Sequence, residues 1–68
     1  MEHSDIVRGM YAELRKKRGC PPMHAIKAFG FYIVESKDGL VLMEQVNAPN
    51  IWEAKYQGVL KWCEIHDK

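Results

Sequence analysis

The sequence lacks most of the features that would place it in a specialised class of protein. Only two of its 68 residues are cysteines, too few for a disulfide scaffold, and no uncharged run approaches the ~20 residues of a membrane span. Ten Lys and Arg against nine Asp and Glu give a net charge of +1, which excludes a protein that coats nucleic acid by bulk electrostatics. The N-terminus, Met1 to Asp5, contains no apolar segment, so we expect no signal peptide and a cytoplasmic location.

Recognisable catalytic chemistry is also absent. Threonine does not occur, and the acidic residues are scattered singly rather than paired. The five glycines form neither of the glycine motifs that cradle phosphates. A Cys63/His66 or Cys20/His24 dyad would place a thiol beside an imidazole, but no oxyanion-hole element accompanies either pair. We therefore expect neither an enzyme nor a cofactor.

What is present indicates one small folded domain. Apolar residues make up 47% of the chain, which excludes intrinsic disorder, and the length allows a single domain over residues 1–68. A domain of this size buries only ~60% of its unfolded surface. Such chains often gain stability from a metal ion or a second subunit, so a partner is expected.

Two helices are predicted, at the two ends of the chain. The first covers residues 4–18, with Ser4 as its N-cap, apolar residues at helical spacing and Gly19 just beyond its basic last turn. The second runs from Ile51 to about His66. Asn50 and Glu53 resemble a capping box at its start.

A β-hairpin is predicted between the helices. Residues 31–34 are aromatic and β-branched, Asp38-Gly39 is a strong turn signal with Gly39 at positive φ, and residues 40–46 form the second strand. Residues 23–29 weakly favour a third strand over a helical turn, and Gly30 indicates a bulge or a strand start. The predicted fold class is thus α+β. The predicted order of elements is a helix, an antiparallel hairpin that a third strand would extend, and a second helix.

Both faces of this hairpin are apolar. Alternation places Phe31 and Ile33 on one face and Tyr32 and Val34 on the other, whereas a sheet with one wet face alternates apolar and polar residues. Each face therefore needs a cover, which is either one helix on each side or both helices on one side and another molecule on the other.

The second helix has an apolar arc wider than a core stripe requires. Its aromatic residues either form the half-buried rim of a core or provide a binding surface, because Trp and Tyr dominate interface hot spots. The partner-binding hypothesis assigns that surface to Trp52, Tyr56, Trp62 and Tyr32. Of the two tryptophans, Trp52 is expected to face outward and Trp62 to face the core.

Two alternative sites remain open. A basic set could contact phosphates, and it comprises Arg8, Arg15, Lys16, Lys17, Arg18 and Lys27. A zinc site would use the pairs Cys20, His24 and Cys63, His66. Without zinc, Cys63 is expected to be buried and slow to react, and Cys20 to react fast.

In size and layout the chain resembles the small single-domain proteins of bacteriophages and mobile elements, some of which bind and block a host or defence protein. Residues 31–62 also resemble, loosely, the β-β-α part of double-stranded-RNA-binding folds, although Asn50-Ile51-Trp52-Glu53 replaces the basic cluster usual there. We therefore expect a non-catalytic protein-binding module, an inhibitor or adaptor that binds another protein or a second copy of itself. The alternative is a small nucleic-acid-binding regulator that uses residues 15–18.

Overall fold

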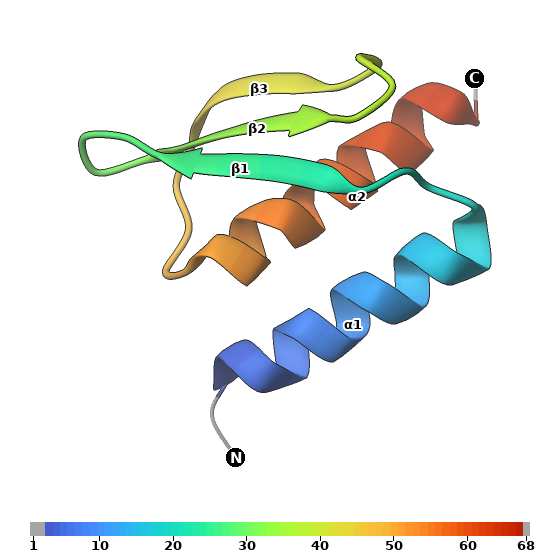
Figure 1. The fold of residues 1–68 in the computed structure, drawn as a ribbon, viewed down its shortest axis with the longest axis horizontal. Coiled ribbons are helices and arrows are strands. Elements are labelled where there is room, and N and C mark those ends of the chain that lie inside the picture. The colour runs from blue at the N-terminus through green and yellow to red at the C-terminus, as the bar shows by residue number, and fades with distance from the viewer. Residues whose placement is uncertain (1–2, 68) are drawn as a thin grey trace.

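The structure, a computed structural model, describes the backbone of residues 3–67 and the side chains of residues 5–67. It is a small single α+β domain (Figure 1). The elements in chain order are α1 (His3–Arg18), β1 (Met23–Lys27), β2 (Tyr32–Ser36), β3 (Leu42–Val46) and α2 (Ile51–His66). The predicted order of helix, antiparallel strands and helix is confirmed.

Helix α1 ends where the sequence predicts. Gly19 adopts a φ of 67°, which other residues rarely tolerate, and the backbone N–H of Cys20 donates to the carbonyl of Arg15 at 2.9 Å. The start differs by one residue, because the helix begins at His3. Ser4 therefore lies inside α1 and is not its N-cap, and its side chain is outside the described part of the chain.

The strands form one antiparallel sheet in the order β1-β2-β3. The prediction that residues 23–29 are extended is confirmed for Met23–Lys27. Gly30 is not a bulge or a strand start: it lies in the turn between β1 and β2 at a φ of 76°, with Ala28 N–H donating to the Phe31 carbonyl at 2.8 Å. Gly39 takes the predicted positive φ, at 78°.

Helix α2 begins as predicted. The Asn50 side chain accepts a hydrogen bond from the Glu53 backbone N–H at 2.9 Å, which satisfies one of the unpaired N–H groups of the first turn. The helix then packs on β1 and β2 with one side and on α1 with the other. The wide apolar arc of α2 therefore packs against two neighbours within the same chain, the sheet and α1.

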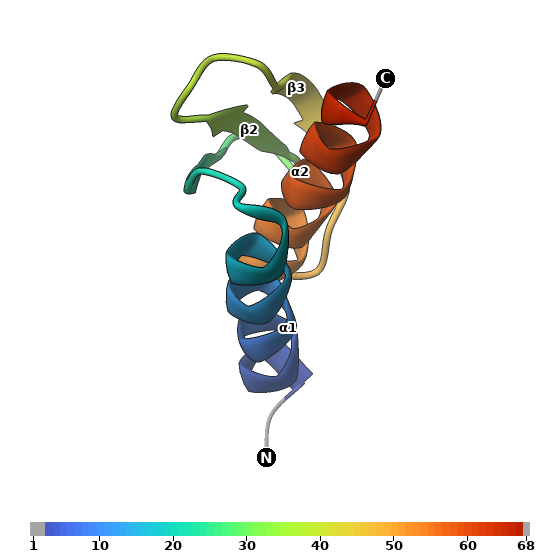
Figure 2. The same cartoon turned by 90° about the vertical axis from the view of Figure 1, so that its right-hand side faces the viewer.

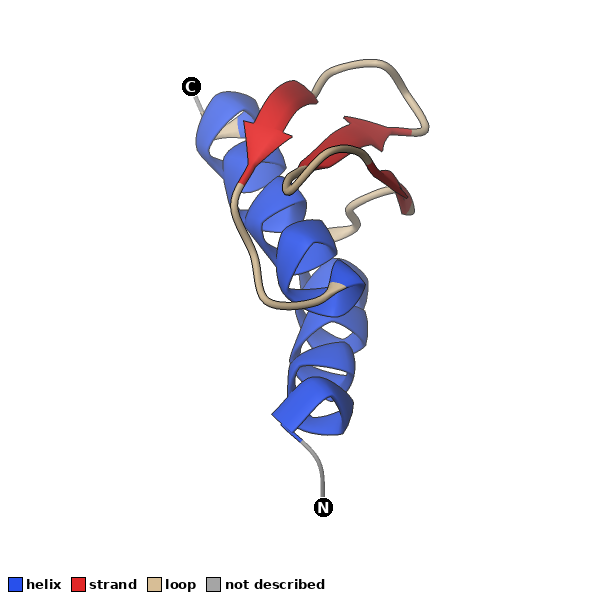
Figure 3. Cartoon of the chain, turned by 90° about the vertical axis from the view of Figure 1, so that its left-hand side faces the viewer, coloured by secondary structure: helices blue, strands red, loops and turns tan. Residues whose placement is uncertain are grey.

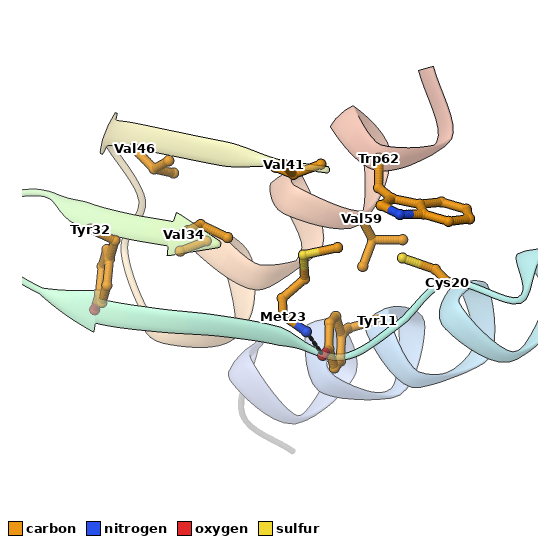
Figure 4. Close-up of a cluster of buried hydrophobic side chains, with 10 residues drawn as sticks. Tyr11, Cys20, Met23, Tyr32, Val34, Val41, Val46, Val59 and Trp62 are labelled. Carbon is orange, nitrogen blue, oxygen red and sulfur yellow. Dashed lines mark hydrogen bonds between the residues drawn. The ribbon is translucent and has the colours of Figure 1, made fainter. Parts of the chain in front are cut away.

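The core lies between α2, the sheet and α1 (Figure 4). Val34, Val41 and Val59 are completely buried there, and the Tyr11 hydroxyl accepts a hydrogen bond from the Met23 N–H at 3.0 Å. Gly58 allows α2 to approach the sheet closely, since a Cβ at this position would lie 2.7 Å from Cγ1 of Val34.

Both helices lie on one side of the sheet. Helix α2 is against the strands, and α1 runs alongside α2 below the β1 edge (Figures 2 and 3). No described segment crosses the opposite face. Of the two arrangements that the apolar hairpin allowed, the structure has the one that leaves a sheet face without an intramolecular cover.

Candidate functional site

The inner and outer faces of the sheet are distinguished by burial along β2. Tyr32, Val34 and Ser36 are buried under the helices, whereas Ile33 is half-buried and Glu35 is exposed. The outer face therefore carries the residues that alternate with the buried ones. They are His24, Ile26, Phe31, Ile33, Glu35, Leu42, Glu44 and Gln45.

Four of these eight side chains are apolar, and they are grouped on the outer face. Ile26 is 53% exposed and Leu42 is 60% exposed, and they lie on the two edge strands on either side of Ile33. Phe31, Ile33 and Leu42 line a shallow hollow on the same face. Phe29, in the adjoining turn, is 98% exposed. Isolated exposed apolar residues are normal, but several on one sheet face indicate an interaction surface.

A bulge in β3 shapes one side of the hollow. Tyr32 pairs with Val46 and Val34 with Met43, so Ile33 on β2 is matched by two residues on β3, Glu44 and Gln45. Both of these side chains line the hollow beside Ile33. The bulge thus adds a carboxylate and an amide to an otherwise apolar edge.

The carboxylates on this face are unpaired. Neither Glu35 nor Glu44 has an ion pair or a side-chain hydrogen bond with any other residue of the described chain. Glu35 lies between His24 and Leu42 in the register of the three strands. The outer face therefore combines an apolar centre with two free negative charges.

Two of the four predicted partner-binding residues are core residues instead. Tyr32 is 8% exposed and Trp62 is 6% exposed, so their rings cannot form an exposed surface. The Trp62 ring points into the space between α2 and the segment after α1 (Figure 4), as expected of a core-facing tryptophan. Neither residue is exposed as the partner-binding prediction requires, because Tyr32 projects from the sheet face that α2 covers and Trp62 projects from α2 into the core.

The other two predicted residues, Trp52 and Tyr56, are half-buried at the contact between the helices. The Trp52 ring lies 5.8 Å from the Tyr11 ring, and the cations of Arg8 and Lys55 lie 5.2 Å and 4.7 Å from its centroid. Trp52 therefore does not project outward as expected, because α1 supplies a packing partner that the helical periodicity of residues 51–66 could not reveal.

Trp62 is held by a polar network at the β2–β3 turn. Its Nε1–H donates to Asp38 Oδ2 at 2.9 Å, while Asp38 Oδ1 accepts from the Ser36 hydroxyl at 2.6 Å and from Leu40 N–H at 3.0 Å. The hydrogen bond from Ser36, followed by that from Trp62, lowers the pKa of the Asp38 carboxyl. This network fastens the turn to α2 and explains why Ser36, a polar residue, is buried.

The predicted phosphate-binding set is not one surface. The Arg15 Nε–H donates to the Cys20 carbonyl at 3.1 Å, and Arg18 forms an ion pair with Asp67 near the end of α2. Arg8 lies over the Trp52 ring. Lys16 and Lys17 are exposed in the last turn of α1, whereas Lys27 ends β1 at the opposite end of the sheet (Figure 1).

The four potential zinc ligands do not converge. His24 is exposed on the outer face while Cys20 is buried on the other side of the sheet, and the His66 ring stacks on Trp62 at 4.4 Å. Among the described residues, no group of three or more His, Cys, Asp or Glu side chains is placed to hold a metal ion.

The accessibility of the two thiols is the reverse of the sequence-based expectation. Cys20 is buried and Cys63 is half-buried, and both are free thiols. Burial, reinforced by the neighbouring Cys63 thiol, raises the pKa of Cys20 to about 11. The prolines after Cys20 end the helix but do not expose its side chain, which packs beneath Trp62 (Figure 4).

Comparison with protein-family models, with curated proteins and with solved structures found no match to this chain. None of the helices in the described part of the chain is long and apolar enough to cross a membrane.

Sequence reasoning missed the residues that give the outer face its character. Ile26, Leu42 and Glu44 carried no aromatic or motif signal, and the search for hot spots favoured tryptophan and tyrosine. The available signal was the doubly apolar hairpin, which required a cover on each face. It did not indicate which face the helices would cover.

Proposed function

We propose that this chain is a small non-catalytic protein-binding module, an inhibitor or adaptor, and that its docking surface is the outer face of the sheet. The observation that supports the proposal is the cluster of Ile26, Ile33 and Leu42 on a face that no described segment covers. Fully burying one Leu or Ile side chain contributes about 1.5–3 kcal/mol. Because these three side chains are already about half-buried, covering them contributes roughly 2–4.5 kcal/mol, against the about 8 kcal/mol of a micromolar complex.

The test compares the chain as bait with a variant altered only on this face. Ile26→Asp with Leu42→Asp introduces two charges at positions that are more than half exposed, so the core is left intact. The matched control is Ile6→Asp with Leu60→Asp, which changes two similarly exposed apolar residues on the helices. Thermal unfolding followed by circular dichroism establishes that all three proteins are folded.

We expect native lysate to yield a protein that binds the wild type and the helix variant but not the sheet variant. Quantitative mass spectrometry of the captured proteins provides the measurement. If the sheet variant retains every protein that the wild type captures, the outer face is not the docking surface. Equal loss from the sheet variant and the helix variant would also refute the proposal.

A further inference from the structure

The outer face has the dimensions of a single helix. Its three strands have five residues each, which at about 3.3 Å per residue and 4.8 Å between strands gives an outline of about 16 Å by 14 Å. A helix with its side chains is about 10 Å wide and rises about 1.5 Å per residue, so about 11 residues cover this length. The inner face of the same sheet already accommodates one helix, α2.

The edges of the sheet are poorly suited to an added strand. Strand addition requires a regular row of free backbone groups along one edge. On β3 that row is interrupted by the bulge at Glu44 and Gln45. On β1 the N–H of Met23 is already bound to the Tyr11 hydroxyl. A partner therefore has better access to the face than to either edge.

The charges on the face indicate the chemistry of the partner. Glu35 and Glu44 are exposed beside the apolar centre and have no ion-pair partner among the described residues. His24 and Gln45 face the same side, and Lys37 lies with His24 and Glu35 at one margin, so the carboxylate of Glu44 has no described cation near it. Covering the centre brings a partner surface next to both carboxylates, and basic side chains at its margin would compensate them. The same carboxylates disfavour a nucleic acid or an anionic lipid surface.

A second copy of the chain is a poorer occupant than a basic helix. Two such faces docked about a two-fold axis bring Glu35 and Glu44 of both copies into one small interface. Like charges placed together across an interface oppose association.

We infer that the outer face binds a short amphipathic helix of another protein, with an apolar stripe over Ile26, Ile33 and Leu42 and Lys or Arg beside Glu35 and Glu44. This inference rests on the proposed function, because it assigns the partner of the same surface. The bound helix forms a third layer, on the opposite side of the sheet from α2.

The probes are two capped peptides of about 14 residues, or four helical turns. Both have the same stripe of leucines in an alanine background, and their flanking positions are all lysine in one peptide and all glutamate in the other. Titration into the isotope-labelled full chain, followed by NMR, gives the affinity and the residues affected. We expect the lysine peptide to bind about tenfold more tightly than the glutamate peptide, with shifts centred on Ile33.

Charge reversal provides the specific control. In the variant Glu35→Lys with Glu44→Lys, we expect the preference to reverse in favour of the glutamate peptide. The variant Glu13→Lys with Glu64→Lys makes the same change in total charge at exposed positions on the helices, and it should retain the wild-type preference. Leu42→Asp should abolish binding of both peptides.

The outcomes separate this inference from the proposed function. If both peptides bind equally well and Leu42→Asp abolishes both interactions, the inference of a basic helix is overturned, but the outer face remains a docking surface. Failure of both peptides to bind also overturns the inference, and the proposed function then depends on lysate capture alone. Binding that Leu42→Asp leaves unchanged places the helix elsewhere and overturns the inference. If lysate capture is equally insensitive to Leu42→Asp, the proposed function fails as well.

Discussion

Replacing Gly58 with alanine tests how closely α2 approaches the sheet. In an exposed helix interior this substitution gains roughly 0.8–1 kcal/mol, because glycine loses more conformational entropy on folding. At position 58 the new Cβ would lie 2.7 Å from Val34 Cγ1 and 3.1 Å from Met23 Sδ. Favourable contact between carbons begins at about 3.5 Å, so the helix or Val34 has to move by close to 1 Å.

Val34 cannot yield easily. It is completely buried, and its β-branched side chain is restricted at χ1 on the central strand. Overpacking of this kind costs about 1–3 kcal/mol, which exceeds the gain in helix propensity. We therefore expect Gly58→Ala to lower the free energy of unfolding by about 1 kcal/mol. In a domain of this size that corresponds to a melting temperature lower by roughly 4–8 °C.

Gly9 provides the matched control. It also lies within a helix, α1, but a Cβ there would meet no atom within 4 Å. Gly9→Ala should raise the free energy of unfolding by about 0.5–1 kcal/mol. Urea denaturation of both variants measures the difference. If Gly58→Ala stabilises the protein as much as Gly9→Ala does, then α2 does not approach β2 as closely as the structure shows.

A double-variant cycle identifies the contact responsible. Val34→Ala removes the methyl group nearest to the new Cβ, at a cost of its own in lost core packing. Adding Gly58→Ala to that background should cost less than it does in the wild type, because the closest contact is gone. Additive effects would place the strain elsewhere.

Three further predictions concern the thiols, the turn and the tryptophans. Cys63 should react with iodoacetamide faster than Cys20, because Cys20 is buried and its pKa is raised to about 11; equal rates in a peptide-resolved mass-spectrometric assay would contradict this. Hydrogen bonds hold the pKa of Asp38 in the folded protein below its pKa in the unfolded chain. The stability that Asp38 contributes is therefore fully present above about pH 4 and is lost as the pH falls through the folded-state pKa. The melting temperature should therefore fall less steeply on acidification for Asp38→Asn than for the wild type, and parallel curves would exclude the network. Trp62→Ala should cost about 3 kcal/mol or more and half-buried Trp52→Ala about 1–2 kcal/mol in urea denaturation, whereas equal costs would contradict the difference in burial.

The end of α1, the start of α2 and the turn after β2 were predictable because their signals are local, whereas β3 begins at Leu42, two residues later than predicted. Gly19 terminates α1, Asn50 caps α2 through its own side chain, and Gly39 takes the positive φ of the turn. Each signal acts within a few residues, so the sequence contains the whole interaction. Gly30 was misassigned because a glycine between two phenylalanines fits a bulge as well as a turn.

The choice of buried face was not predictable because it depends on contacts between distant residues. Alternation correctly placed Tyr32 and Val34 on one face and Ile33 on the other, but both sets are apolar. The buried face is the one that contains Ser36, whose hydroxyl accepts from Val41 N–H at 2.9 Å and donates to Asp38. Hydropathy alone would expose a serine, and the partners that allow its burial are Asp38 in the turn and Val41, just before β3.

The composition of the outer face bears on how permanent its partner is. Interfaces of obligate complexes are more hydrophobic than those of transient ones, and charged residues are depleted from interface cores. Here Glu35 and Glu44 lie beside Ile33 and Leu42 without ion-pair partners in the described chain, so the free face keeps hydrated charges next to its apolar side chains. Helix α2, in contrast, has most of its apolar arc covered by the sheet and by α1, with Ile51 and Leu60 left partly exposed. The wide arc that made an obligate partner a reasonable expectation is therefore largely covered within the chain, and a partner on the outer face should bind reversibly to an already folded domain.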